Sequence, residues 1–296
     1  MSTSKSLIRN SKMISLKAFG VDTKSYHSMK RYMMSGCMTI IAALMISFNF
    51  SSCTKDDSLE EGLTSISLIY KPGTDVKLIN KAEYCQSVIA DGKELITGTE
   101  RGAIRVSELK DPKVYITFKK DLSSLESTFE GCEDLTSIPS SLFSLHRNAA
   151  NFAWVFSNCK SLQSLPETLF SSNTKATDFS DTFYSCKSLT SIPENLFAHN
   201  PNVTTFDGTF TYCTGLQSIP TSLFDNNKTV TSFTSTFDGC TSLTGESPYT
   251  IVNNTKVHLY EREFFPQSFS VPSSHYATFC GCTGLTDYSQ IPSSWK

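Results

Sequence analysis

The segment Phe152-Ala-Trp-Val-Phe-Ser-Asn-Cys-Lys-Ser-Leu-Gln-Ser-Leu-Pro-Glu-Thr-Leu-Phe170 is one copy of a pattern that recurs at intervals of 27 residues. Each copy carries a cysteine, with a phenylalanine three residues before it and a leucine three residues after it. The cysteines are Cys132, Cys159, Cys186, Cys213 and Cys240. A fixed period of about 20 to 50 residues predicts supersecondary units that stack on one another.

The spacing inside one copy predicts a short helix and a short strand. Phe152, Phe156 and Cys159 stand at i, i+4 and i+7, which places them on one face of a helix. The stretch from 162 to 165 suits a strand of a few residues, which Pro166 ends because proline has no backbone N–H. We therefore expect an α/β solenoid of 27-residue coils, with short parallel strands on one face and short helices on the other.

The repeat also resembles a known family. Leu-x-x-Ile-Pro-x-x-Leu-Phe followed by Phe-x-x-x-Phe-x-x-Cys-x-x-Leu is similar to the BspA-like leucine-rich repeats of bacterial surface proteins, over roughly residues 122 to 296. The family's usual repeat is a few residues shorter, so the loop after Leu-Phe is longer here. The resemblance implies a leucine-rich-repeat solenoid and a role in adhesion to host or neighbouring-cell proteins.

The regions on either side of the repeats are expected to cap them. Residues 62–120 lack the period and alternate like strands, which predicts a β-rich N-terminal cap or, alternatively, a small separate β-domain. The repeats occupy 121–243. In 244–296 the next Phe-x-x-Cys, at Phe279 and Cys282, comes 42 residues after the previous one, which indicates a final coil and a C-terminal cap.

The sequence pattern of the first 52 residues is typical of a signal peptide. Basic residues precede an apolar stretch from 38 to 50, which is too short to span a bilayer, and Ser51-Ser52-Cys53 follows. This ending resembles a bacterial lipobox and implies a lipid on Cys53, although Phe50 departs from the leucine commonest there; an ordinary secretory signal is the alternative. If Met29 is the true start, residues 1–28 are an untranslated upstream extension.

Residues 53–61 are polar and acidic, as is typical of a solvated tether. Lys55, Asp56 and Asp57 resemble the export signal that sends certain Gram-negative lipoproteins to the outside of the outer membrane. The resemblance implies a protein that is lipid-anchored, exposed on the cell surface and in contact with the membrane only through its anchor. Ser58 lies in a sequence that resembles an O-glycosylation site of such bacteria.

The composition argues against catalysis and nucleic-acid binding. From residue 122 to 296 there are 8 Lys or Arg and 15 Asp or Glu, the reverse of a nucleic-acid surface. The sequence has no metal-ligand spacing of His, Cys, Asp and Glu, no Gly-rich phosphate loop and no Gly-x-Ser-x-Gly. We therefore expect a protein that is not an enzyme and that has no catalytic residues, metal or cofactor. The cysteines share a face with phenylalanines, so we expect buried thiols.

Exposed aromatic residues are the candidate binding surface. On a helix Trp154 would lie about 200° from Phe152 and point outward, Tyr212 would do the same, and Tyr184 would lie nearer the rim. Such residues can anchor a partner, although scattered ones are also ordinary surface. We predict a module for adhesion to host or other cell-surface proteins, with a glycan-binding accessory protein as the alternative. The sequence names neither the ligand nor the face that binds it.

Overall fold

The computed structural model describes residues 65–96 and 100–296, which lie in one compact unit, Glu61–Lys296. The signal peptide, the lipidated Cys53 and the export signal at Lys55, Asp56 and Asp57 lie outside the described residues. Within the described ranges, no helix is long and apolar enough to cross a membrane.

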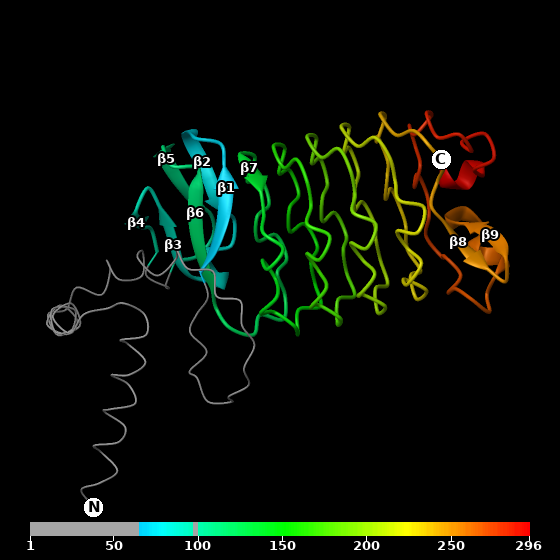
Figure 1. Cartoon of the computed structure of the whole chain (residues 1–296), viewed down its shortest axis with the longest axis horizontal. Coiled ribbons are helices and arrows are strands. Elements are labelled where there is room, and N and C mark those ends of the chain that lie inside the picture. The colour runs from blue at the N-terminus through cyan, green and yellow to red at the C-terminus, as the bar shows by residue number, and fades with distance from the viewer. Residues whose placement is uncertain (1–64, 97–99) are drawn as a thin grey trace, which may run out of the picture. The chain divides into compact units, whose positions relative to one another are not determined.

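The N-terminal part is antiparallel β-structure (Figure 1). A five-stranded sheet has the order β4-β3-β6-β1-β7, with β1 (Ile66–Tyr70), β3 (Cys85–Ala90), β4 (Lys93–Glu94), β6 (Lys113–Phe118) and β7 (Leu135–Ser137). A second sheet pairs β2 (Gly73–Ile79) with β5 (Ile104–Leu109), and a short 3-10 helix, η1 (Ala82–Tyr84), precedes β3. The alternate residues of β1 are buried, as expected for a strand with one face on a core.

This sheet is joined to the first repeat. Strand β7 is part of that repeat and pairs antiparallel with β1, so that Tyr70 lies opposite Leu135. The ring of Phe118, at the end of β6, makes edge contacts with Phe129 and His146 of the repeat. The β-structure and the repeats therefore share one hydrophobic core.

The repeats form successive coils that stack in a row (Figure 1). Equivalent residues of neighbouring coils are joined by single parallel bridges, at Ser124, Asn151, Asp178, Thr205, Ser232 and Ser274. The phenylalanine that precedes each cysteine is fully buried. For example, the ring of Phe156 stacks on Phe129 and Phe183, with centroids 5.6 Å apart in each case.

The predicted α/β leucine-rich-repeat solenoid is wrong. The described residues contain no α-helix, and all their multi-residue strand pairs are antiparallel, unlike parallel strands backed by helices. In the segment predicted as a helix, Trp154 and Asn158 have φ values of 61° and 59°. An α-helix cannot pass through left-handed residues, so this segment is a series of turns.

The hydrogen bonds between coils run along the segment that was predicted as a helix. There, alternate backbone N–H groups donate to carbonyls of the next coil at 2.7–2.9 Å, from Phe152, Trp154, Phe156 and Asn158 to Asp178, Ser180, Thr182 and Tyr184. The stretch from 162 to 165, predicted as a strand, has no strand, and its N–H at Gln163 makes one long bond of 3.4 Å to Thr136. The apolar spacing is compatible with both arrangements, and these backbone bonds distinguish them.

The row of cysteines is buried in the stack, and all cysteines of the described residues are free thiols. Five of these thiols donate to the carbonyl of a phenylalanine in the preceding coil, those of Cys159, Cys186, Cys213, Cys240 and Cys282. For example, Cys186 Sγ lies 3.2 Å from the oxygen of Phe156. Burial raises the pKa of Cys186 to about 12, which keeps it protonated. These thiols are structural donors in an apolar core.

A second buried row consists of asparagines. The side chain of Asn200 donates to the carbonyls of Phe170, at 3.1 Å, and Asn173, at 2.8 Å, in the preceding coil. Asn173 and Asn227 make the equivalent pairs of bonds. At the end of the row, the guanidinium of Arg262 replaces the asparagine side chain and donates to the carbonyls of Asn227 and Phe224.

The C-terminal region closes the stack. The hairpin of β8 (Tyr249–Val252) and β9 (Thr255–His258) turns through Asn253 and Asn254, both with positive φ, and η2 (Leu259–Phe264) follows and carries Arg262. After the last coil, η3 (Ser293–Trp295) buries Trp295, whose carbonyl accepts the N–H of Phe279. The last coil thereby gains a hydrogen-bond acceptor that a following coil would otherwise supply.

Candidate functional site

Trp154, Tyr184 and Tyr212 lie side by side on three consecutive coils and form what we call the aromatic row. The ring centroids of Trp154 and Tyr184 are 6.1 Å apart, and those of Tyr184 and Tyr212 are 5.7 Å apart. Trp154 is 37% exposed and Tyr212 is 45% exposed, while Tyr184 is half-buried between them. The structure thus brings the three residues predicted from the sequence into one continuous surface.

The aromatic side chains point outward because residues of their coils have a left-handed backbone conformation. The prediction had instead placed these side chains on a helix. The position of Trp154 has a φ between 52° and 62° in every coil, at Ser127, Trp154, Asp181, Gly208, Ser235 and Ala277. Tyr212 has a φ of 57° in a second such column, where other coils have glycine, asparagine or serine. A large aromatic residue in this conformation costs roughly 1–2 kcal/mol relative to glycine. Such a cost, at an exposed side chain, points to a role other than stability.

A glycine in the next coil makes room for the ring of Tyr212. A Cβ atom added to Gly239 would lie 2.3 Å from Cδ1 of Tyr212. Any other residue at Gly239 would therefore displace the ring. Gly239 also has a positive φ of 70°, so its backbone favours glycine as well.

A carboxylate that the sequence reasoning missed borders the aromatic row. Asp181 occupies the same column as Trp154, one coil later, and its carboxylate leans over Gly208, where an added Cβ would lie 2.2 Å from Oδ1. No hydrogen bond or ion pair of this carboxylate is found among residues 65–96 and 100–296. The alignment of Asp181 with Trp154 in the 27-residue period was the signal that could have identified it.

The charges of two further aspartates act on Asp181. Burial, together with the negative charges of Asp207 and Asp178, raises the pKa of Asp181 from 3.8 to about 6. Asp178 accepts the N–H of Ser180 at 2.8 Å, and Asp207 accepts the N–H of Thr234 at 2.8 Å. The charges of Asp178 and Asp207 are therefore partly satisfied by the backbone, whereas Asp181 is a crowded, half-buried anion without a partner.

Replacing Asp181 by Asn should raise the free energy of unfolding at neutral pH by about 1–2 kcal/mol, after allowance for partial exposure of the group. Folding raises this pKa, so the folded protein binds the proton more tightly than the unfolded chain between about pH 4 and about pH 6. The free energy of unfolding of the wild type therefore falls as the pH rises through this window. Urea unfolding of the wild type and the variant across this pH range should show that their free energies of unfolding diverge as the pH rises. A constant difference between the two free energies would contradict the prediction.

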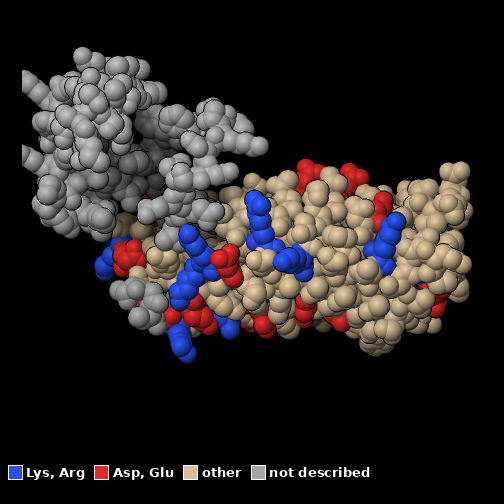
Figure 2. Space-filling model, turned by 90° about the horizontal axis from the view of Figure 1, so that it is seen from below, with Lys and Arg blue, Asp and Glu red and all other residues tan. Residues whose placement is uncertain are grey.

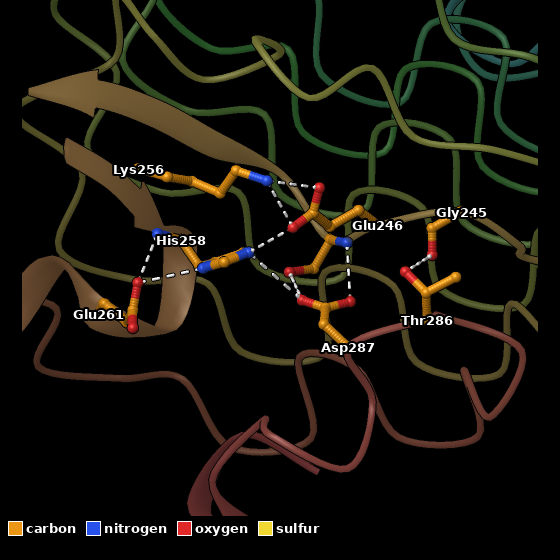
Figure 3. A network of polar contacts seen from close by, with 8 residues as sticks. Gly245, Glu246, Lys256, His258, Glu261, Thr286 and Asp287 are labelled. Atoms are coloured by element: carbon orange, nitrogen blue, oxygen red, sulfur yellow. Dashed lines mark hydrogen bonds and ion pairs between the residues drawn. The ribbon is translucent and has the colours of Figure 1, made fainter. Parts of the chain in front are cut away.

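A polar network in the C-terminal region contains serine, histidine and acidic side chains, but its geometry is not that of a nucleophile (Figure 3). His258 lies between two carboxylates, with Nε2 3.0 Å from Glu246 and Nδ1 3.1 Å from Glu261. Ser247 is fully buried and donates to Asp287 at 2.5 Å. A nucleophilic serine instead needs exposure and a hydrogen bond to its base.

The same network connects the hairpin to the last coil. Lys256 donates to both oxygens of Glu246, at 2.8 and 2.9 Å, and Asp287 accepts the backbone N–H of Ser247 at 3.0 Å. The hydrogen bonds of Lys256, and then of His258, lower the pKa of Glu246. These contacts tie residues 246–261 to residue 287, which is a structural role.

The described part of the chain offers no group of three or more His, Cys, Asp and Glu residues placed to hold a metal ion. Uncharged residues cover most of the coils on the face shown in Figure 2, where a few Lys and Arg side chains are scattered and the acidic side chains lie mainly along the edges. This face lacks the continuous basic stripe on which nucleic-acid binding depends. The aromatic row and Asp181 therefore remain the candidate site. No protein-family model matches the chain, and no curated protein matches it.

Proposed function

We propose that this protein is a non-enzymatic binding module that is anchored to the cell surface by lipid and binds a protein ligand through the aromatic row. The observation that carries the proposal is the contact of Trp154, Tyr184 and Tyr212 across three coils. Clustered, partly exposed tryptophan and tyrosine are the side chains that most often dominate protein interfaces. The coils beneath them are joined by hydrogen bonds and stacked phenylalanines. The surface is therefore already ordered, and binding costs little conformational entropy of the protein.

The ring orientations favour a protein over a glycan as the ligand. The planes of Trp154 and Tyr184 are inclined by 40°, and those of Tyr184 and Tyr212 by 80°. A linear glycan stacks best on rings that share one plane, because each sugar presents a flat apolar face. Tilted rings instead present both edges and faces, which suit the apolar and charged side chains of a protein.

The cellular location remains a proposal that rests on residues outside the described ranges. Cys53 is the proposed lipid attachment site, and Lys55, Asp56 and Asp57 are the proposed signal for export to the outer surface of the outer membrane. The resemblance of the repeat motif to BspA-like surface proteins supports adhesion at the level of sequence. The leucine-rich-repeat fold that it implied is not the one observed.

Trp154 offers the direct test of the binding surface. Trp154→Gly should weaken binding to a cell-surface or matrix protein by about 2 kcal/mol or more, as expected for an anchor residue. Glycine adopts the φ of 61° without strain, and this offsets part of the packing that is lost with the partly buried ring. The free energy of unfolding should therefore change by less than about 2 kcal/mol, and the variant stays folded. Binding is measured on arrays of purified matrix proteins and confirmed in solution.

Tyr276 provides the matched control. It is 72% exposed and lies outside the aromatic row, so Tyr276→Gly removes an exposed ring from another place. A ligand that binds the Trp154→Gly protein as tightly as the wild type would exclude this surface. Binding to polysaccharide gels in place of proteins would support the glycan-binding alternative.

Lipidation is tested at Cys53. Cys53→Ala should leave the precursor unprocessed or release the protein from the membrane, because alanine cannot carry the thioether-linked lipid. Metabolic labelling with an alkyne fatty acid, and protease treatment of intact cells, measure attachment and surface exposure. Full protection from protease, with labelling retained, would contradict surface exposure and leave the lipid anchor in place.

A further inference from the structure

We propose that the ligand docks on the aromatic row through a segment rich in lysine and arginine, with a cationic side chain that meets Asp181 at the border of the row. This inference rests on the proposed function and names the chemistry of its partner. It commits to a positively charged protein segment as the occupant of the surface.

The first observation is the position of Asp181 within the row. The N–H of Trp154 donates to the carbonyl of Ser180 at 2.9 Å, and the N–H of Tyr184 donates to the carbonyl of Asp181 itself at 3.1 Å. Asp181 therefore follows the residue bonded to Trp154 and begins the turn that ends at Tyr184. The carboxylate and the two rings emerge from one small area of backbone.

The second observation is the missing counter-charge. Elsewhere in the stack one exposed acid, Glu133, pairs with a cation of the neighbouring coil, Lys160, at 2.7 Å. No Lys, Arg or His of the described residues forms an ion pair with Asp178, Asp181 or Asp207. A half-buried group of carboxylates without a cation is unfavourable in the free protein, and a ligand cation would relieve it.

The third observation is the character of the surrounding surface. The faces of tryptophan and tyrosine attract ammonium and guanidinium groups through the ring quadrupole. From residue 122 to 296 the chain has 8 Lys or Arg against 15 Asp or Glu, so a cationic partner also meets a favourable long-range field. The tilted rings, the unpaired carboxylate and the excess of acid all favour the same ligand chemistry, and the absence of a flat ring platform disfavours a neutral glycan.

The test uses three synthetic peptides, in which Ser alternates with Lys and Arg, with Gln, or with Glu. The purified protein should bind the Lys and Arg peptide, and should bind the Gln peptide at least about tenfold more weakly. Asp181→Asn should weaken binding of the Lys and Arg peptide by about fivefold, and raised salt should weaken it further. Asp181→Lys should reverse the preference, so that the Glu peptide binds better than the Lys and Arg peptide.

Glu167→Gln is the control for net charge. Glu167 is exposed, and its carboxylate accepts the side chain of Asn195 on another part of the coils, so its removal should change peptide binding by less than about twofold. Equal binding of the Lys and Arg peptide and the Gln peptide would overturn the inference, as would unchanged binding by both Asp181 variants. A matrix protein whose binding depends on Trp154 but not on Asp181 would also overturn it, while leaving the proposed function intact.

Discussion

Phe156→Ala lowers the free energy of unfolding by about 3–5 kcal/mol, the largest loss expected from an apolar substitution in this chain. Phe156 is fully buried, and its ring stacks on Phe129 and Phe183, with interplanar angles of 4° and 6°. Phe143 covers its side at a centroid distance of 5.8 Å. The cavity left by alanine would lie in the middle of this row, where stacked neighbours cannot collapse into it without breaking the hydrogen bonds between coils.

Denaturant unfolding of Phe156→Ala and Phe264→Ala measures this effect. Phe264 is 70% exposed, so the same chemical change there should cost less than about 0.5 kcal/mol. A loss below about 1 kcal/mol for Phe156→Ala would mean that the phenylalanine rows are not packed as the structure shows. Because Phe156 lies beneath the aromatic row, its variant should lose ligand binding only to the extent that it unfolds.

Asn200→Asp has the second largest expected effect, a loss of about 3–5 kcal/mol at neutral pH. The two side chains have nearly the same shape, so the change removes two donated hydrogen bonds and adds a negative charge without leaving a cavity. The carboxylate would face the carbonyl oxygens of Phe170 and Asn173, which Asn200 now contacts at 3.1 and 2.8 Å. Asn200 is fully buried, so water cannot screen this repulsion.

Asn226→Asp is the control, because Asn226 is exposed and should tolerate the charge at a cost within about 0.5 kcal/mol. The loss at Asn200 should shrink in acid, where a protonated carboxyl group can again donate one hydrogen bond. The measurement is urea unfolding of both variants at neutral and acidic pH. Equal stabilities of the two variants would show that the asparagine row is not a buried hydrogen-bond ladder.

The function and the stability of the site make opposite demands on the sequence. Asp181 is expected to destabilise the folded protein, and Trp154 has a left-handed φ that glycine would adopt more easily. In the coil that follows Asp181, the same position is occupied by Gly208. An unpaired carboxylate and a strained backbone, in the same column of neighbouring coils, are what a binding site would require if its ligand compensates for both.

The resemblance to leucine-rich repeats predicted the buried positions of the repeat but not its backbone conformation. Its motif correctly marked the apolar positions, since the cysteine, leucine and phenylalanine rows are all buried. It misplaced the secondary structure, because spacing of i, i+4 and i+7 fits a helix and also fits consecutive turns that carry a left-handed residue every fourth position. Serine and glycine recur in those left-handed columns, and aspartate and asparagine each occur there once; each of these residues tolerates such a conformation or favours turns.

The sequence by itself determined the 27-residue period, the buried rows and the residues of the aromatic row, because each of these follows from the order of apolar and aromatic side chains along the chain. The tertiary structure decided which backbone groups bond between coils, and hence that turns replace the predicted helices and strands. It also decided that Asp181 lies beside Trp154 without a counter-charge, and that Arg262 completes the asparagine row. These features depend on contacts between residues about 26 to 38 positions apart, which local spacing does not specify.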